Sequence, residues 1–171
     1  IGKYTKYNYP TKDSLITFYE TELNNKAIYA NYIFDINKYV RLNASIRYDD
    51  FTYLFNNKLP IGTPSANNHF TNWTPKLGIN FNQNHHGVYI NYSEGFVPPQ
   101  ITEIYNAIRV PFLLPQKFKN FEIGSWYQTK KIYGEVSLYQ LNGSNEIISV
   151  RQTDGVNLNQ NSGATKHIGI E

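Results

Sequence analysis

The feature that most constrains the fold is a run, residues 39–49, in which apolar and polar side chains alternate almost without exception. Successive side chains of a β-strand point to opposite faces, so this run predicts a strand with one apolar and one polar face. The preceding run, residues 28–36, repeats the pattern, and only Asn37 and Lys38 separate the two. Two alternating runs joined by two turn-forming residues predict a β-hairpin.

The length of these runs narrows the class of fold further. Strands in soluble proteins usually have about five or six residues. About ten residues, rising about 3.3 Å each and tilted by about 40°, span roughly 25 Å, which is the height of the apolar band of an outer-membrane barrel. The mean hydropathy of −0.51 fits a barrel that is apolar outside and polar inside. No stretch approaches the roughly 18 apolar residues that a transmembrane helix needs.

The spacing of the remaining strands supports a barrel. Strands are predicted over about 26–36, 39–50, 71–82, 88–96, 118–128 and 132–141, with a seventh at the end of the chain. Asn24 and Asn25 are expected to interrupt the extended structure before the first of these strands. Short turns at 37–38, 83–87 and 129–131 alternate with long loops at about 51–70, 97–117 and 143–165. Outer-membrane barrels show the same alternation of short periplasmic turns and long extracellular loops.

Aromatic residues are abundant, with 15 Tyr, 10 Phe and 2 Trp. We predict two belts at the boundaries of the apolar band. The periplasmic belt contains Phe34, Tyr39, Phe81, Tyr89, Tyr127 and Tyr133, and the outer belt contains Tyr48, Phe51, Trp73, Phe96 and Phe121. Pro75 lies in the third strand, where a proline is tolerated only near a strand end, an edge or a bulge.

Five short motifs, in order along the chain, resemble those of TonB-dependent outer-membrane receptors. They are the segments 46–49, 73–78, 92–105, 120–124 and 169–171. The family-motif residues are Tyr92, Ser93, Glu94, Gly95, Phe96, Pro98, Pro99, Glu103, Glu122 and Gly124. The resemblance implies an all-β fold, an antiparallel meander of about seven strands that forms part of a transmembrane β-barrel of about 22 strands. We therefore expect residues 1–171 to be a partial barrel domain, an internal piece that lacks the plug domain and the C-terminal strands.

The resemblance also implies a function. Receptors of this family import iron–siderophore complexes, cobalamin, haem or glycans across the bacterial outer membrane, powered through TonB. The expected function is import of a metal chelate, with a ferric siderophore as the preferred cargo. The expected partners are the TonB complex, through the plug domain, outer-membrane lipid and the small-molecule chelate.

Residues in the long loops are the candidates for substrate binding, because loops on a rigid barrel commonly carry recognition. They are Tyr53, Phe55, Phe70, Tyr105, Arg109 and Phe112. The alternative role for them is loop packing and contact with lipopolysaccharide. Glu94 and Glu103 are expected at the mouth of the barrel, paired with Arg47 or Lys76, and the alternative is that either carboxylate contacts ligand.

Other chemistry finds little support in the sequence. No catalytic motif is present, the adjacent His85 and His86 fit a polar turn, and we expect no cofactor and no metal site in the chain. A net charge of +3 without a stripe of Lys and Arg gives no indication of nucleic-acid binding. Two other classes remain open, a soluble β-sandwich that binds a ligand such as a carbohydrate and a barrel hydrolase with a Ser–His pair. A sandwich would pack its apolar faces on each other.

Overall fold

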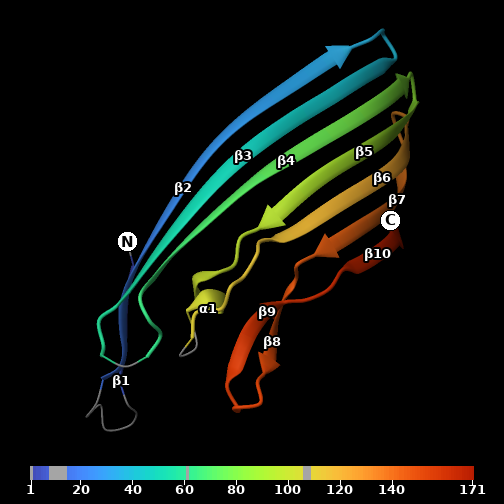
Figure 1. Ribbon diagram of the computed structural model, residues 1–171. Coiled ribbons are helices and arrows are strands. Elements are labelled where there is room, and N and C mark those ends of the chain that lie inside the picture. The colour runs from blue at the N-terminus through green and yellow to red at the C-terminus, as the bar shows by residue number, and fades with distance from the viewer. Residues whose placement is uncertain (1, 8–14, 61, 106–108) are drawn as a thin grey trace.

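The computed structural model describes residues 2–7, 15–60, 62–105 and 109–171, and their side chains from residue 17 onward. Within these residues, eight strands form one antiparallel sheet in the order β1-β2-β3-β4-β5-β6-β7-β10 (Figure 1). The strands are β1 (Gly2–Tyr7), β2 (Leu15–Asp35), β3 (Val40–Asn57), β4 (Ala66–Gln83), β5 (His86–Val97), β6 (Gln116–Gln128), β7 (Tyr133–Ser144) and β10 (Thr165–Ile170). The predicted antiparallel meander of about seven long strands is confirmed, with β1 as an added edge strand.

Two small elements stand apart from this sheet. A short helix, α1 (Ile101–Ile104), follows β5, and a separate hairpin is formed by β8 (Ile147–Arg151) and β9 (Asn157–Asn161). Figure 1 shows both at the same end of the curved sheet, which we call the long-loop end. The opposite end carries the tight connections and is called the short-turn end. Among the described residues, no helix has the length and apolarity to cross a membrane.

Strands β2, β3 and β4 are longer than predicted. Asn24 and Asn25 do not break β2, because they pair with Thr52 and Phe51 of β3. The predicted loop at 51–70 is wrong over most of its length, since the connection between β3 and β4 spans only residues 58–65. Ladder hydrogen bonds to a neighbouring strand outweigh the low strand propensity of asparagine at these positions. The predicted loops at 97–117 and 143–165 contain α1 and the β8–β9 hairpin.

The register places apolar side chains in continuous rows on one face of the sheet. One row crosses seven strands and is formed by Phe34, Leu42, Ile79, Ile90, Ile123, Leu138 and Ile170. This apolar face is uncovered by other described residues, and Ile28, Leu77 and Leu138 are 69%, 58% and 53% exposed. A soluble domain rarely leaves so large a continuous apolar surface in water.

The opposite face is polar. Adjacent strands contribute a row that contains Asn31, Ser45, Lys76, Ser93 and Asn120. One face of each strand is therefore suited to hydrocarbon and the other to water, which is the division that a transmembrane barrel requires.

The aromatic belts are confirmed only in part. Tyr48 and Trp73 lie side by side on the apolar face near the long-loop end, with ring centroids 4.8 Å apart, and Tyr39 and Phe81 lie similarly near the short-turn end. Phe51 is three residues from Tyr48 and so lies on the other face. Tyr89 and Tyr133, both placed in the periplasmic belt, also project from the polar face, where each hydroxyl lies against Glu135. The prediction placed Phe51 by its height along the strand and did not account for the face on which it lies.

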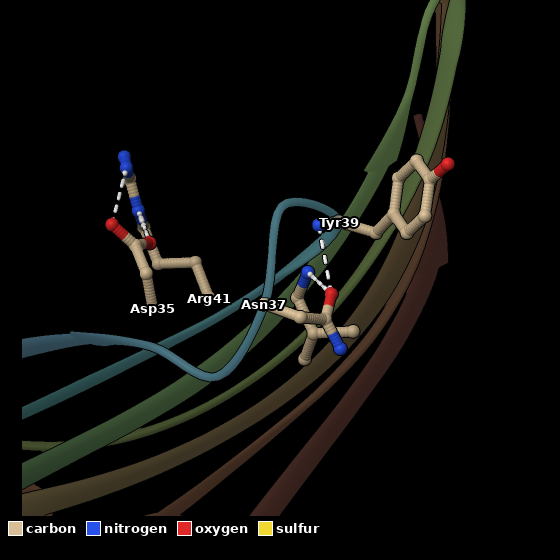
Figure 2. A network of polar contacts seen from close by, with 5 residues as sticks. Asp35, Asn37, Tyr39 and Arg41 are labelled. Atoms are coloured by element: carbon tan, nitrogen blue, oxygen red, sulfur yellow. Dashed lines mark hydrogen bonds and ion pairs between the residues drawn. The ribbon is translucent and has the colours of Figure 1, made fainter.

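The β2–β3 connection shows how local sequence sets a tight turn (Figure 2). The Asn37 side chain folds back, and its Oδ1 accepts hydrogen bonds from the backbone N–H groups of Tyr39 and Val40 at 2.8 and 3.0 Å. Beside it, Arg41 donates from Nε to Asp35 Oδ1 at 2.6 Å and from Nη2 to Oδ2 at 3.2 Å. An asparagine that caps its own turn terminates β2 and starts β3.

Pro75 marks a change in the pairing of β4. It faces Ile46 of β3, but the ladder from β4 to β5 begins only at Lys76, which pairs with Ser93. Residues 66–75 of β4 therefore pair with β3 alone. A residue without a backbone N–H is tolerated where a ladder ends, so the predicted register around Pro75 holds although β4 is a central strand.

Candidate functional site

Most of the residues predicted to bind substrate lie together in a core at the long-loop end. Tyr53, Phe55, Phe70 and Tyr105 are only 4–8% exposed and pack with Ile104 and Leu113. The rings of Phe55 and Tyr105 stack with centroids 4.3 Å apart, and those of Tyr53 and Phe70 meet edge to face at 5.6 Å. The alternation of residues 51–55 along β3 puts these rings on the polar face, where the segment after β5 covers them.

This core anchors the α1 segment to the extensions of β3 and β4. The Tyr105 hydroxyl donates to Asn68 Oδ1 in β4, and Thr63 Oγ1 donates to the Tyr105 carbonyl at 3.5 Å. Burial raises the pKa of Tyr105 to about 12 and also raises that of Tyr53. In this conformation the four rings are buried as two contacting pairs in one core, and they become available to a ligand only if the α1 segment moves.

Arg109 and Phe112 are placed differently from the other candidates. The Phe112 side chain is 86% exposed. Arg109 is also exposed, and its Nη2 lies 3.2 Å from Asp154 Oδ2 in the connection between β8 and β9. These two residues present an aromatic ring and a guanidinium to solvent on the outside of the packed core.

Asparagine side chains tie the β8–β9 hairpin to the neighbouring loop. Asn161 Nδ2 donates to the carbonyl oxygens of Leu114 and Asn145 at 2.9 and 2.6 Å, and its Oδ1 accepts from the Leu114 N–H at 2.8 Å. Asn159 Nδ2 donates to the Glu103 carbonyl at 2.8 Å. The connections 98–115 and 145–164 are therefore joined by specific polar contacts.

The family-motif residues lie around the end of β5. The Tyr92 hydroxyl donates to Glu94, and Glu94 Oε1 lies 3.8 Å from Lys119 Nζ. Ser93 pairs with Lys76 where the β4–β5 ladder ends, and Pro99 is fully buried. Gly95 has open space around the position of a Cβ, so no described neighbour demands glycine there. Pro98 follows β5 directly and starts the connection to α1.

The other motif residues have structural partners. Glu103 closes a capping box with Gln100, whose backbone N–H donates to Glu103 Oε2 at 2.7 Å. Glu122 Oε1 accepts from the Tyr89 hydroxyl at 2.8 Å, and Gly124 lies beneath the Tyr89 ring. The expected pairing of Glu94 and Glu103 with Arg47 or Lys76 is wrong, because each carboxylate has a nearer partner on its own segment or on β6.

Arg47 instead forms a bidentate pair within β3. Its Nε and Nη2 donate to the two carboxylate oxygens of Asp49, each at 2.7 Å. Asp49 is 4% exposed, whereas nearly half of the Arg47 side chain is open to solvent. The two residues are two apart and so share a face, a signal that was present in the sequence.

A hollow of about 420 Å³ lies on the polar face where β5 leaves β4. Its lining includes Tyr29, Arg47, Asp49, Thr74, Lys76, Glu94 and Phe96. A neighbouring hollow of about 330 Å³ shares Ser45 and Lys76 and is lined by amides such as Asn43, Asn91 and Asn120. Together they offer cations, carboxylates, amides and aromatic rings, a set that can hold a polar, charged small molecule.

Neither hollow resembles a metal centre. Within the ranges that the structure describes, no group of three or more His, Cys, Asp or Glu side chains is arranged to hold a metal ion. His85 instead places Nδ1 3.0 Å from the Gln128 carbonyl at the short-turn end. The predicted Glu94 and the family-motif Phe96 contribute to the larger hollow, whereas Tyr29, Asp49 and Thr74 were not among the predicted site residues.

Comparisons with known proteins identify the fold. A family model described as "TonB dependent receptor-like, beta-barrel" matches residues 2–171. The copper transporter OprC shares the fold with a TM-score of 0.78 and 14% identity over 98% of this chain and 29% of that one. No curated protein sequence matches the chain.

Two further solved structures are similar. The ferric-catecholate import receptor Fiu from E. coli K12 has a TM-score of 0.69 and 19% identity over 94% of this chain and 27% of that one. The second is a double mutant of the Serratia marcescens hemophore receptor HasR in complex with its hemophore HasA and heme. It has a TM-score of 0.71 and 15% identity over 86% of this chain and 31% of that one. The chain thus spans between 27% and 31% of the length of these three structures.

Proposed function

The chain belongs to the TonB-dependent receptor-like β-barrel family, and from that premise we propose that its strands form part of the barrel wall of a receptor that imports a metal chelate. Members of this family are transporters of the bacterial outer membrane. A ferric siderophore is the preferred cargo, since the similar structures include a ferric-catecholate import receptor and a receptor for alcaligin. Two other similar structures are those of a copper transporter and of a hemophore receptor with its hemophore and heme.

The observation that carries the proposal is the two-sided sheet. The apolar row across seven strands fits contact with lipid, while the opposite face is polar and hollowed. A β-sandwich is not favoured, because no second described sheet packs on the apolar face. Transport through a barrel requires no covalent step, and we assign no catalytic role to any residue.

We place substrate contact at the long-loop end, in two layers. Arg109 and Phe112 are exposed and suited to first contact with an anionic, aromatic chelate. The hollow beside Arg47, Lys76 and Phe96 lies deeper on the polar face. It combines an aromatic ring with two cations and with the carboxylates of Asp49 and Glu94. Tyr53, Phe55, Phe70 and Tyr105 support the loops in the closed arrangement, and they contact cargo only when the α1 segment is displaced.

The energy source that we propose is the TonB complex, acting through a plug domain outside these residues. The polar wall, including Asn43, Lys76 and Asn91, would face that plug and water. Outer-membrane lipid would cover the apolar face.

An uptake assay tests the proposal. Cells that express the intact protein carrying this chain are given radiolabelled ferric siderophore, with and without an energised inner membrane. We expect accumulation only in energised cells, and we expect Arg109→Ala to raise the concentration needed for half-maximal uptake. Lys131→Gln, in the β6–β7 turn at the short-turn end, is the matched control and should behave as the wild type. Equal uptake in energised and de-energised cells would refute active transport.

A further inference from the structure

The smaller of the two hollows on the polar face has a floor without a side chain. Gly78 of β4 pairs with Asn43 of β3 and with Asn91 of β5, so it lies between two residues with amide side chains. A Cβ at residue 78 would lie 2.7 Å from Asn91 Oδ1 and 3.9 Å from Asn43 Cβ. The Asn91 side chain therefore lies across the glycine, and a larger residue would displace it. We call this hollow of about 330 Å³ the amide basin.

The side chains around the amide basin have hydrogen-bonding groups that the chain does not use. Four amides and two hydroxyls line it, and they belong to Asn31, Asn43, Ser45, Asn91, Ser93 and Asn120. None of these six side chains forms a hydrogen bond with another residue that the structure describes. Elsewhere on the polar face, Arg47 is paired with Asp49 and Tyr89 with Glu122. The half-buried amides of the basin are therefore available to a ligand.

A single lysine supplies positive charge at the edge of the basin. Lys76 lines both the amide basin and the larger hollow beside Arg47, and it forms no ion pair within the described part of the chain. The carboxylate in the lining of the basin is that of Glu122, which lies two strands away and accepts from the Tyr89 hydroxyl. With strands about 4.8 Å apart and about 3.4 Å per residue, the backbones of Lys76 and Glu122 are roughly 12 Å apart. The Lys76 ammonium is thus an uncompensated charge beside neutral donors.

These groups favour one class of ligand. An ammonium binds a carboxylate, while amides and hydroxyls both donate to and accept from the hydroxyl groups of a ligand. Tyr92 is the one aromatic residue in the described lining, and its side chain belongs to the apolar face, in register with Leu77 and Phe121. A flat aromatic chelate therefore finds no ring to stack on. The volume is at the small end of the range for ligand pockets, which suits a molecule of the size of a sugar.

We propose that the amide basin binds a small polyhydroxylated carboxylate of the sugar-acid class, with the carboxylate at Lys76 and the hydroxyls on Asn43, Asn91 and Asn120. The basin lies further from the long-loop end than the larger hollow, since Asn43 is four residues from Arg47 along β3. It is a second site on the same polar wall, and Lys76 borders both. The proposal rests on the proposed function for the position of this wall inside an aqueous barrel, and it does not depend on which chelate is carried.

Isothermal titration calorimetry of the intact protein in non-ionic detergent tests the site. The probes are gluconate, sorbitol and hexanoate, which have the same number of carbons and carry a carboxylate with hydroxyls, hydroxyls alone and a carboxylate alone. Gluconate should bind more tightly than either of the others. Loss of a charge-assisted hydrogen bond weakens binding by roughly tenfold, which is the loss expected for Lys76→Gln, whereas Lys76→Arg should retain most of the affinity. Asn91→Ala removes a neutral hydrogen bond and should weaken gluconate binding by about fivefold.

Further variants distinguish the basin from the larger hollow and from a general effect of substitution. Gly78→Ala puts a methyl group where the Asn91 amide lies and should weaken gluconate binding at least as much as Asn91→Ala does. Lys131→Gln and Gly134→Ala are matched controls toward the short-turn end and should bind gluconate as the wild type does. No described heavy atom lies within 4 Å of a Cβ added at Gly134.

The outcomes separate this site from the transport function. A wild type that does not bind gluconate, or that binds sorbitol or hexanoate equally well, would overturn the proposal. Gluconate affinity that is unchanged in Lys76→Gln or in Gly78→Ala would also overturn it, and so would an equal loss in the two controls. Energy-dependent siderophore uptake is measured on the same wild type, and its absence would count against the transport function and not against the basin.

Discussion

Gly124 makes a close approach that can be tested by adding a single methyl group. Gly124 on β6 pairs with Tyr89 on β5, and the Tyr89 ring lies across the glycine. A Cβ at residue 124 would fall well inside 3.0 Å of Tyr89 Cζ, the hydroxyl oxygen and Cε1. Carbon atoms in contact prefer about 3.5–4.0 Å, so Gly124→Ala forces the ring to move by roughly 1 Å.

The ring cannot move without loss, because its hydroxyl is held at both sides. The Tyr89 hydroxyl oxygen lies 2.8 Å from Glu122 Oε1 and 3.0 Å from Glu135 Oε1, so its single proton is shared between two carboxylate acceptors. Overpacking costs about 1–3 kcal/mol, and one weakened hydrogen bond to a carboxylate adds about 1.5 kcal/mol at the low end of its range. We expect Gly124→Ala to lower the free energy of unfolding by roughly 2–4 kcal/mol.

The assay is urea unfolding of the intact protein in lipid vesicles, followed by tryptophan fluorescence. Gly134→Ala on β7 is the matched control, since no described heavy atom lies within 4 Å of the Cβ it would add. Alanine in place of a strand glycine should be neutral or stabilising by about 0.5–1 kcal/mol there. In a Tyr89→Ala background, Gly124→Ala should lose most of its effect. Equal stability of the two single alanine variants would refute the steric reasoning.

Three further outcomes are expected. Burial raises the pKa of Tyr105 to about 12, so the folded protein holds the hydroxyl proton more tightly than the unfolded chain does. The resulting stability is complete below about pH 10 and is lost as the pH rises from about 10 to about 12. Ultraviolet difference absorbance of the wild type against Tyr105→Phe measures this titration. Asn37→Ala removes the acceptor of two turn N–H groups and should lower the free energy of unfolding by about 1 kcal/mol in the same urea assay. Arg109→Ala should change stability by less than about 0.5 kcal/mol, because its pair with Asp154 is exposed, while weakening siderophore uptake.

The strands that follow strict alternation were predictable from the sequence. The runs 28–36 and 39–49 became the paired ends of β2 and β3, since one apolar and one polar face leave a single register. The interruption predicted at Asn24 and Asn25 was wrong because their conformation depends on pairing with β3 and not on their own strand propensity. The β8–β9 hairpin was also missed. β8 (IISVR) is only five residues long, and β9 (NLNQN) is almost entirely polar and takes its order from pairing with β8 and from contacts with neighbouring loops.

The site was less accessible to sequence reasoning. The aromatic residues at 51–55 alternate, which would have placed Tyr53 and Phe55 on the polar face of a longer strand, yet nothing local shows that Tyr105 stacks on them. The hollow near Arg47 exists because β5 departs from β4 after Ser93. Pro75 was the one local sign of that departure, and its meaning depends on a strand distant in sequence.

The amide of Asn161 has a mechanical consequence. Its side chain hydrogen-bonds to the backbone of two separate connections, at Leu114 and at Asn145. Tension applied to one of these connections is therefore transmitted to the other. Asn159 fastens the same hairpin to the short helix through Glu103. A displacement of α1 from the long-loop end therefore also displaces the β8–β9 hairpin. The two elements move together until these hydrogen bonds are broken.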